Sequence, residues 1–212
     1  MRLLVSGATA TLAKYGARHG DVLGCLPVPR AANDPAKLAA LGLPIAADNG
    51  AFNGFEPLPF VRMLTAFMEA GVKLEWVACP DVVADAVATW RLWHRWEGII
   101  RAFGFRPAMV LQDGMDAMGV SDFDPPVVFV GGTTGYKLGH DARRIVAWAR
   151  KKNRPAHMGR VNTQRRIEYA VQIGCTSCDG SGFSKWPDTR IPMGIRWIRQ
   201  AMHPTFTEAT RC

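Results

Sequence analysis

Eight short apolar runs, separated by helical segments, constrain the fold of this chain more than any other feature of its sequence. Each run is nearly continuous in apolar residues, whereas a half-exposed strand would alternate apolar and polar positions. Continuous runs are typical of strands buried on both faces, and therefore of a parallel sheet. The runs lie at residues 3–5, 22–26, 44–47, 76–79, 108–111, 127–130, 156–158 and 175–179.

Helix signals fill most of the intervals between these runs. Asp34 is a good N-cap, Pro35 suits the first helical position, and Gly42 predicts the end of that helix. Asn162 is expected to cap a later helix that closes at Gly174. Further helices are expected at residues 59–70, after residue 81, at 141–152 and from 191 onward.

Alternating strands and helices predict an α/β protein, specifically a compact single-domain (β/α)8 barrel of the TIM type. A doubly wound open sheet is the alternative topology. No internal repeat or linker interrupts the pattern, so one domain should span residues 1–212, with residues 203–212 as a frayed tail.

The charge balance points to a polyanionic partner. Lysine and arginine number 26 against 18 acidic residues, which gives a net charge of +8 and a pI near 9.6. Nucleic acid is the usual partner of such a chain, although a soluble enzyme can simply be basic. The sequence shows no secretory leader and no apolar run near the roughly 20 residues of a membrane span. We therefore expect a cytoplasmic protein with reduced cysteines and no membrane partner.

Polar residues and glycines follow most of the predicted strands. In a parallel barrel, active-site side chains come from the carboxyl ends of several strands. Each residue alone is explained as a cap or turn residue, but together they indicate a site. The set is Asp48, Asp81, Gln112, Gly131, Gly132, Gly159 and Asp179.

This set suits substitution at a glycosidic carbon. Of two carboxylates that flank one sugar carbon, one can attack C1′ while the other handles protons. A further carboxylate and an amide can hydrogen-bond the Watson–Crick edge of a guanine-like base. Glycines allow the backbone to approach such a ring closely.

The same segments resemble those of the tRNA-guanine transglycosylases and their DNA-acting relatives, the 7-deazaguanine DNA transglycosylases of phages and bacteria. The likeness covers about residues 44–185. Its segments are Asp48-Asn49-Gly50-Ala51-Phe52, Leu111-Gln112-Asp113-Gly114, Gly131-Gly132-Thr133-Thr134-Gly135, and His157-Met158-Gly159-Arg160 followed by the strand that ends at Asp179.

The resemblance implies roles for individual residues. Asp179 would be the nucleophile that forms a covalent glycosyl-enzyme, and Asp48 the general acid/base. Asp81 and Gln112 would bind the heterocycle, although Asp85 lies one helical turn further on and competes with Asp81 for this role. The remaining substrate contacts would come from Phe52, Gly131, Gly132, Met158 and Gly159.

The chain departs from the tRNA-acting members, which carry a zinc site of three cysteines and a histidine after the nucleophile. After Asp179 this sequence has only His203 and Cys212, so we predict no metal and no other cofactor. Cys175 and Cys178 are read as core thiols. The departure favours an enzyme that exchanges guanine in DNA for a 7-deazaguanine base of the preQ0 or preQ1 type. The alternatives are a tRNA-guanine transglycosylase, a nucleosidase and a non-catalytic nucleic-acid-binding barrel.

Basic residues in the second half of the chain are candidates for phosphate contacts, with a solvated basic face as the alternative. Lys185, just beyond the nucleophile, could hold a splayed nucleotide. Trp90, Trp93 and Trp96 could stack bases but are more typical of core packing. The oligomeric state stays open. The phosphate-contact candidates are Arg150, Lys151, Lys152, Arg160, Arg165, Arg166 and Lys185.

Overall fold

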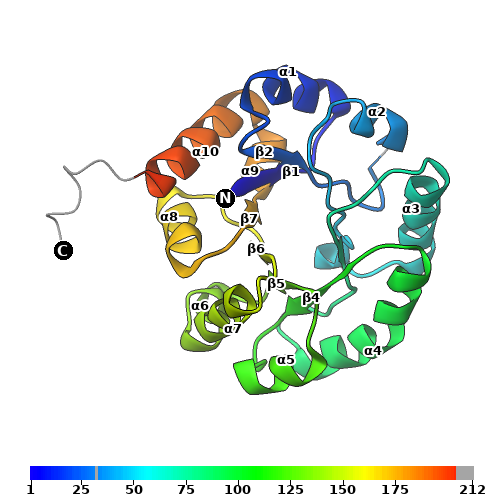
Figure 1. Ribbon diagram of the computed structural model, residues 1–212, viewed down its shortest axis with the longest axis vertical. Helices are drawn as coiled ribbons and strands as arrows, with labels where there is room; N and C mark the ends of the chain where they lie inside the picture. The colour runs from blue at the N-terminus through cyan, green and yellow to red at the C-terminus, as the bar shows by residue number, and fades with distance from the viewer. Residues whose placement is uncertain (32, 204–212) are drawn as a thin grey trace, which may run out of the picture.

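Seven parallel strands form one curled sheet in the computed structural model, which describes residues 1–31 and 33–203. Their order in the sheet is β2-β1-β7-β6-β5-β4-β3, and helices surround them (Figure 1). The strands are β1 (Arg2–Val5), β2 (Leu23–Cys25), β3 (Val77–Ala78), β4 (Pro107–Leu111), β5 (Val127–Val130), β6 (Ala156–Met158) and β7 (Ser177–Asp179).

Residues 45–47 join the two edges of this sheet. Ile45 forms a parallel bridge with Cys25 of β2, and Ala47 forms one with Val77 of β3. The Cys25 N–H donates to the Pro44 carbonyl at 2.8 Å, and the Ala78 N–H donates to the Ala47 carbonyl at 2.8 Å. The prediction of a TIM-type α/β barrel is confirmed, with one correction. The predicted strand at 44–47 is reduced to isolated bridges between β2 and β3.

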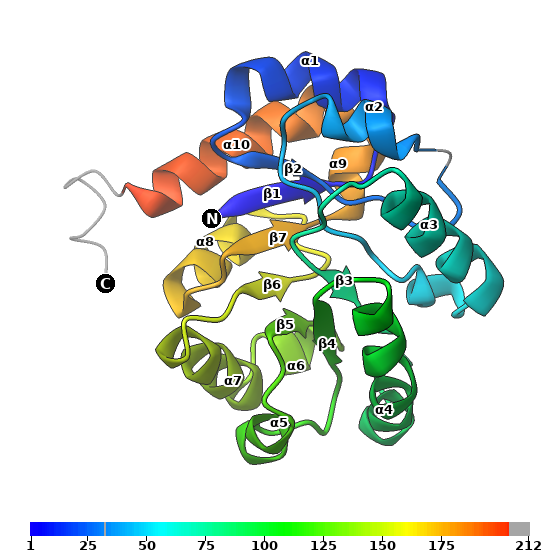
Figure 2. The same cartoon turned by 45° about the vertical axis from the view of Figure 1, so that its right-hand side comes forward.

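The helices lie outside the strands, and the first and last of the long ones, α1 and α10, lie side by side (Figures 1 and 2). A short 3-10 helix, η1 (Ala51–Asn53), follows the bridging segment. The α-helices are α1 (Thr9–His19), α2 (Pro35–Ala39), α3 (Pro57–Glu69), α4 (Ala86–Ala102), α5 (Ala117–Phe123), α6 (Thr134–Lys137), α7 (His140–Lys151), α8 (Gln164–Ile173), α9 (Ser181–Lys185) and α10 (Pro187–Met202).

The helix caps agree with the sequence in one case and differ in another. The side chain of Asp34 accepts a hydrogen bond from the Lys37 N–H at 3.1 Å, as predicted. The prediction that Asn162 caps α8 is wrong, because Thr163 is the N-cap. The Asn162 side-chain oxygen instead accepts from the Gly182 N–H at 2.8 Å, which ties the loop after β6 to α9.

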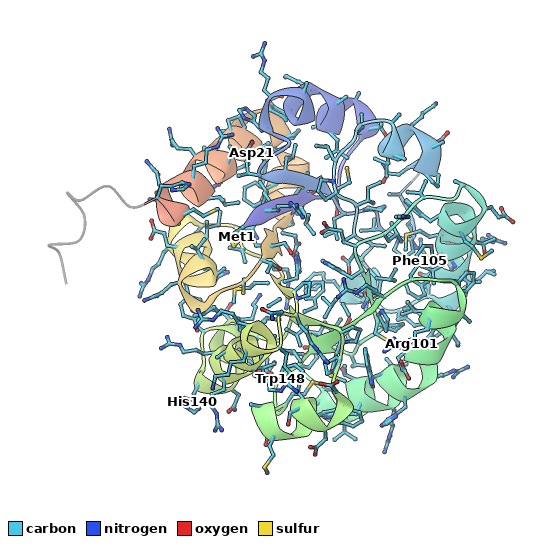
Figure 3. The ribbon with its side chains drawn as sticks, in the orientation of Figure 1. Met1, Asp21, Arg101, Phe105, His140 and Trp148 are labelled. Carbon is cyan, nitrogen blue, oxygen red and sulfur yellow. The ribbon has the colours of Figure 1, made fainter. Side chains whose placement is uncertain are left out.

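Two apolar layers explain why the strand sequences are continuous. Leu4 points into the barrel, while its neighbours Leu3 and Val5 belong to the layer between strands and helices. Side chains fill the space inside the strands (Figure 3), so the interior of the barrel is packed. The inner layer is made by Leu4, Leu26, Ala46, Trp76, Ala78, Ala108, Val110, Val127 and Phe129.

Cys175 and Cys178 are buried free thiols, which confirms their reading as core residues. No helix in the described part of the chain is both long and apolar enough to cross a membrane. Among residues 1–31 and 33–203, no three His, Cys, Asp or Glu side chains are grouped to hold a metal ion. Cys212 and the predicted frayed tail from residue 204 onward lie outside the described residues.

Candidate active site

A pocket opens at the carboxyl ends of the strands, with a volume of about 470 Å³ that includes the solvent space at its mouth. Asp48 and Asp179, which are far apart in the sequence, both line it. A ligand in this pocket would therefore meet both carboxyl groups. The lining residues are Asp48, Asn49, Phe52, Asp81, Val83, Val110, Gln112, Phe129, Gly131, Gly159, Arg160 and Asp179.

Asp179 ends strand β7, and its two carboxylate oxygens differ in their surroundings. Oδ1 lies 3.1 Å from His157 Nε2 and accepts the backbone N–H of Arg160 at 3.1 Å. Within the described residues, Oδ2 has no hydrogen-bond partner. The side chain is 19% exposed, so this second oxygen is free to meet a ligand. The two contacts to Oδ1 orient the carboxylate and leave Oδ2 directed at the position of a substrate, as a nucleophile requires.

His157 is fully buried on β6 and connects Asp179 to Ser177, the residue opposite it on β7. Its Nδ1 lies 2.9 Å from the Ser177 hydroxyl oxygen. Because a carboxylate only accepts hydrogen bonds, Nε2 must carry the hydrogen that points at Asp179. In the neutral ring, Nδ1 then accepts the Ser177 O–H. The rings of Trp76 and Phe129 pack against the imidazole, with centroids 4.9 and 4.5 Å away.

Asp48 follows the bridging segment and is half-buried. Burial, together with the negative charge of Asp179, raises the pKa of Asp48 to about 7. The Asn49 N–H donates to its carboxylate at 2.8 Å and opposes this rise only in part. Asp48 is therefore a carboxyl group that can both give and take a proton near neutral pH.

Asp81 forms a buried polar network with two amide side chains. Its Oδ1 accepts from Asn49 Nδ2 at 2.7 Å, and its Oδ2 accepts from Gln112 Nε2 at 2.6 Å. Burial raises the pKa of Asp81, and these two donors oppose the rise. Asp85, the competing residue, caps α4 by accepting from the Ala88 N–H and does not line the pocket.

Asn49 is a site residue that the sequence analysis did not single out. Its Nδ2 also donates to the Cys79 carbonyl at 2.6 Å, and its Oδ1 accepts from the Ala51 N–H at 2.7 Å. The side chain thus fixes the loop after residues 45–47 to the end of β3. Its position in Asp48-Asn49-Gly50, directly after an apolar run, was the available signal.

The glycines of the site differ in whether they allow close packing and in whether their backbone groups are available to a ligand. A Cβ on Gly159 would lie 2.5 Å from the Phe129 ring, so only glycine fits there. Gly131 lines the pocket, but its N–H donates to the Leu111 carbonyl at 3.1 Å and is not free for a base. Gly132 lies outside the lining, and its carbonyl accepts from Arg160 Nη2 at 2.6 Å.

Two further predicted substrate contacts lie at different depths. Phe52 is 66% exposed at the pocket mouth, with the Arg160 guanidinium 4.8 Å from its ring centroid. Met158 is buried in the layer between strands and helices, because its neighbours His157 and Gly159 take the inward positions. It does not line the pocket.

The predicted basic patch is divided between the two ends of the barrel. Residues 150–152 end helix α7 just before β6 begins, which places them at the amino ends of the strands. Arg160 follows β6, Arg166 lies in the first turn of α8, and Lys185 ends α9 just after β7, so these three lie on the pocket side. Arg165, in the same turn, instead lines a separate hollow between α8 and α10. Residues that are close in sequence are separated here by the length of a strand.

No protein-family model matches the sequence, and no curated protein matches it. Solved structures do resemble the chain. They include a native KDPGal structure (12% identity, TM-score 0.57, 94% of this chain and 92% of that one) and a 3-hexulose-6-phosphate synthase (14%, 0.55, 95% and 99%). Tryptophan synthase from M. tuberculosis is similar at 9% identity, with a TM-score of 0.60 over 95% of this chain and 91% of that one. These likenesses show the barrel fold alone.

Proposed function

We propose that this protein is a glycosyltransferase of the guanine transglycosylase type. It exchanges guanine in DNA for a 7-deazaguanine base of the preQ0 or preQ1 type through a covalent aspartyl-glycosyl intermediate. The observation that carries the proposal is the pair Asp48 and Asp179, which share one pocket in unlike surroundings. Two carboxyl groups whose environments differ in this way can take separate acid and nucleophile roles.

The proposed reaction has two displacements. In the first, Oδ2 of Asp179 attacks C1′, the bond from C1′ to N9 of guanine breaks, and Asp48 gives its proton to the departing base. In the second, the Asp48 carboxylate takes the N9 proton of the incoming 7-deazaguanine. N9 then attacks C1′ and releases Asp179. Each proton that Asp48 gives is recovered in the second step, so no other acid or base is required.

The network around Asp81 fits recognition of guanine. Guanine presents neighbouring N–H donors at N1 and N2, which a carboxylate can accept together. Each Asp81 oxygen already accepts one amide hydrogen, and a carboxylate oxygen can accept a second. Val110 and Phe129 supply apolar walls for the ring. Asn49 and Gln112 hold the carboxylate in place before the base arrives, which lowers the cost of ordering it on binding.

The pocket lining favours attack by a carboxylate over attack by an amine. Covalent catalysis by an amine needs a lysine that reaches the substrate. None of the residues that line the pocket in the described chain is a lysine. The nearby Lys137 donates its ammonium hydrogen to the Gly159 carbonyl at 3.0 Å instead. Asp179 is thus the best placed nucleophile.

The mouth of the pocket suits an extended strand of nucleic acid. A wider groove of about 1040 Å³, open to solvent, continues on the other side of Asp48 and Phe52 and carries Arg30. Phe52, at this mouth, is 66% exposed, and an exposed aromatic ring can stack on a base. The target nucleotide must be flipped out of a duplex or come from a single strand, because C1′ and the base edge are not both accessible in the helix.

Incorporation of a labelled base tests the proposal. Purified protein is incubated with DNA or with tRNA, together with radiolabelled 7-deazaguanine bases. We expect label in DNA and a covalent protein–DNA species on a denaturing gel, both lost in Asp179→Asn and kept in Asp122→Asn, a control at an exposed aspartate. Incorporation of the label into tRNA but not into DNA would identify tRNA as the substrate. Guanine release without incorporation would identify a nucleosidase, and binding without either reaction would overturn the enzyme.

A further inference from the structure

A second, smaller hollow lies beside the pocket that Asp48, Asp81 and Asp179 line, which we call the acidic pocket. The volume of this hollow, about 200 Å³, includes open solvent. Three cationic residues, Lys137, Arg160 and Arg166, line it. Gly159 and Arg160 line both cavities. A ligand that extends from the acidic pocket past Arg160 would therefore meet a concentration of positive charge.

Lys137 is the most unusual member of this cluster, because its side chain is buried without a carboxylate partner among the described residues. It is 5% exposed, and its ammonium donates to the Gly159 carbonyl at 3.0 Å. Burial and the positive charges of Arg160 and Arg166 lower the pKa of Lys137 to about 8. A buried ammonium without a counter-charge is costly, and a bound anion would remove that cost.

The two arginines are also held without a carboxylate partner in the described chain. Arg160 Nη2 donates to the Gly132 carbonyl at 2.6 Å, and Arg166 Nη2 donates to Thr134 Oγ1 at 3.3 Å. Arg160 has a φ of 58°, a left-handed conformation that is strained for a residue with a side chain. That conformation lets its N–H bond Asp179 while its guanidinium reaches Gly132.

The nearest negative charges do not neutralise the cluster. Asp113 accepts hydrogen bonds from the hydroxyl and N–H of Thr133, at 2.5 and 2.8 Å. Asp179 is bound to His157 and to the backbone of Arg160. Both carboxylates act on Lys137 only through space. The local charge of three cations therefore exceeds that of the two acids.

We propose that Lys137, Arg160 and Arg166 form a binding site for one phosphate group, carried by the sugar whose C1′ is attacked by Asp179. This inference rests on the proposed function and deepens it. Arginine offers paired N–H donors to phosphate oxygens, and lysine adds a point charge, so the three side chains match the chemistry of one phosphate. Because Arg160 links this cavity to Asp179, phosphate binding would also position the sugar against the nucleophile.

The phosphate could be a phosphodiester of a nucleic acid strand or the monoester of a free nucleotide. A set of oligonucleotides separates these sources. One phosphate at a time beside the target guanosine is replaced by an uncharged methylphosphonate, and kcat/KM for base exchange is measured with the wild-type protein. At one position we expect a loss of about 10- to 100-fold, the effect of removing one charged hydrogen-bonding group. No loss at any position would overturn a phosphodiester site.

Arg166→Gln is the matching protein variant, because Arg166 is only half-buried and its change should leave the fold intact. We expect the same 10- to 100-fold loss with intact DNA and no further loss at the sensitive methylphosphonate position. Lys73→Gln, which removes an exposed cation just before β3 at the other end of the barrel, should behave as wild type. Losses that multiply in the combined experiment would contradict the proposed contact.

A binding measurement keeps the inference separate from the proposed reaction. Inorganic phosphate, guanosine monophosphate and a guanine-containing oligonucleotide are titrated into Asp179→Asn, which cannot form the intermediate, with and without Arg166→Gln. Phosphate binding that is lost with Arg166→Gln supports the site even if no exchange activity is found. Tight binding of the monophosphate but not of the oligonucleotide would reassign the source to a free nucleotide and overturn the phosphodiester. Equal binding with and without Arg166 would overturn the site itself.

Discussion

The Nε2 atom of His157 lies 3.1 Å from Oδ1 of Asp179, at the bottom of the acidic pocket. The ring is fully buried, and its other nitrogen is held by Ser177 at 2.9 Å. This arrangement anchors one oxygen of the carboxylate and leaves the other for a substrate. His157 is a positioning residue in this scheme, since it acts on the substrate only through Asp179.

Replacing His157 should therefore slow formation of the covalent intermediate. We expect a decrease of about 10²-fold in His157→Gln, the scale seen when an aligned group in an active site is lost. Ser177→Ala should have a smaller effect of about 10-fold, because it removes only the hydroxyl that holds Nδ1 and leaves the contact between Nε2 and Asp179. Quenched-flow trapping of the protein–DNA species measures the rate. His140→Gln at an exposed histidine is the control, and an unchanged rate in His157→Gln would refute the role.

The pH dependence of kcat/KM should report the protonation of Asp48. The proposed first step needs the protonated carboxyl group, whose pKa is raised to about 7. We expect kcat/KM for the DNA substrate to be constant at lower pH and to fall about tenfold per pH unit above 7. Initial rates between pH 5 and 9 at constant ionic strength measure this profile. A profile that is flat from pH 6 to 8 would contradict the acid role of Asp48.

Asp48→Asn should make the protein more stable at pH 8 while abolishing exchange. In the unfolded chain Asp48 loses its proton near its ordinary pKa of 3.8, whereas in the folded chain it does so near 7. Between these values the folded state binds more protons, so wild-type stability falls as pH rises and levels off above 7. The upper limit of the gain in the variant is about 4 kcal/mol, at about 1.4 kcal/mol per pH unit.

Denaturant unfolding of wild type and Asp48→Asn at pH 5 and pH 8 measures this difference. The gain should be largest at pH 8 and less than half as large at pH 5, at most about 1.7 kcal/mol. Asp122→Asn should show no gain at either pH. Equal stability of the two proteins at pH 8 would show that Asp48 is not strained by burial and by the charge of Asp179.

Gly159→Ala should impair both stability and catalysis. The added Cβ would lie 2.5 Å from the Phe129 ring and 3.4 Å from Oδ1 of Asp179. We expect a loss of about 1–3 kcal/mol of unfolding free energy from overpacking, together with slower formation of the intermediate. Gly98→Ala is the matched control, because that glycine lies in α4 with open space around its Cβ position. In this control the free energy of unfolding should rise by about 0.5–1 kcal/mol, because alanine favours a helix more than glycine does. A fully active Gly159→Ala would contradict the tight packing described here.

Removing cations at the two ends of the barrel should affect DNA binding differently. The double variant Lys151→Gln, Lys152→Gln changes the end away from the pocket and should leave affinity within about twofold. Arg166→Gln with Lys185→Gln should weaken binding and reduce the slope of log K against log salt by about 1.8, at 0.9 per duplex phosphate contact. Fluorescence anisotropy at several salt concentrations measures both. A larger loss of affinity in the Lys151→Gln, Lys152→Gln variant would instead indicate that DNA binds at the amino ends of the strands.

Much of the fold was predictable because the barrel strands carry a strong local signal. Runs such as Val127-Val128-Phe129-Val130 are buried on both faces, which is typical of strands in a parallel sheet, and β5 does pair in parallel with β4 and β6. The helix α1 was missed because it has one buried residue, Leu12, and no capping side chain. Its formation depends on packing against β2 and α10, which sequence periodicity does not reveal.

Site residues that directly follow a strand could be predicted from the sequence. Residues whose role depends on the direction of the side chain or on a contact with another element could not. Asp48 and Asp179 share a pocket because strand ends converge in a barrel. The predicted Met158 contact does not reach the acidic pocket because strand residues alternate faces, and the same alternation turns His157 inward. Asn49 and Lys137 could not be identified because their roles depend on hydrogen bonds to Asp81 and Gly159, which lie on other elements. Spacing along the sequence does not reveal such contacts.

The aromatic packing inside the barrel has a consequence for the order of events. The rings of Trp76, Phe129 and His157 pack against one another beneath the pocket and fill the interior in the part of the chain that the structure describes. The departing guanine must therefore leave through the same pocket mouth by which the incoming base enters. Guanine must leave before the 7-deazaguanine base binds, and in the interval the sugar stays covalently bound to Asp179. Steady-state kinetics with two varied substrates should then give the parallel double-reciprocal lines of a ping-pong reaction.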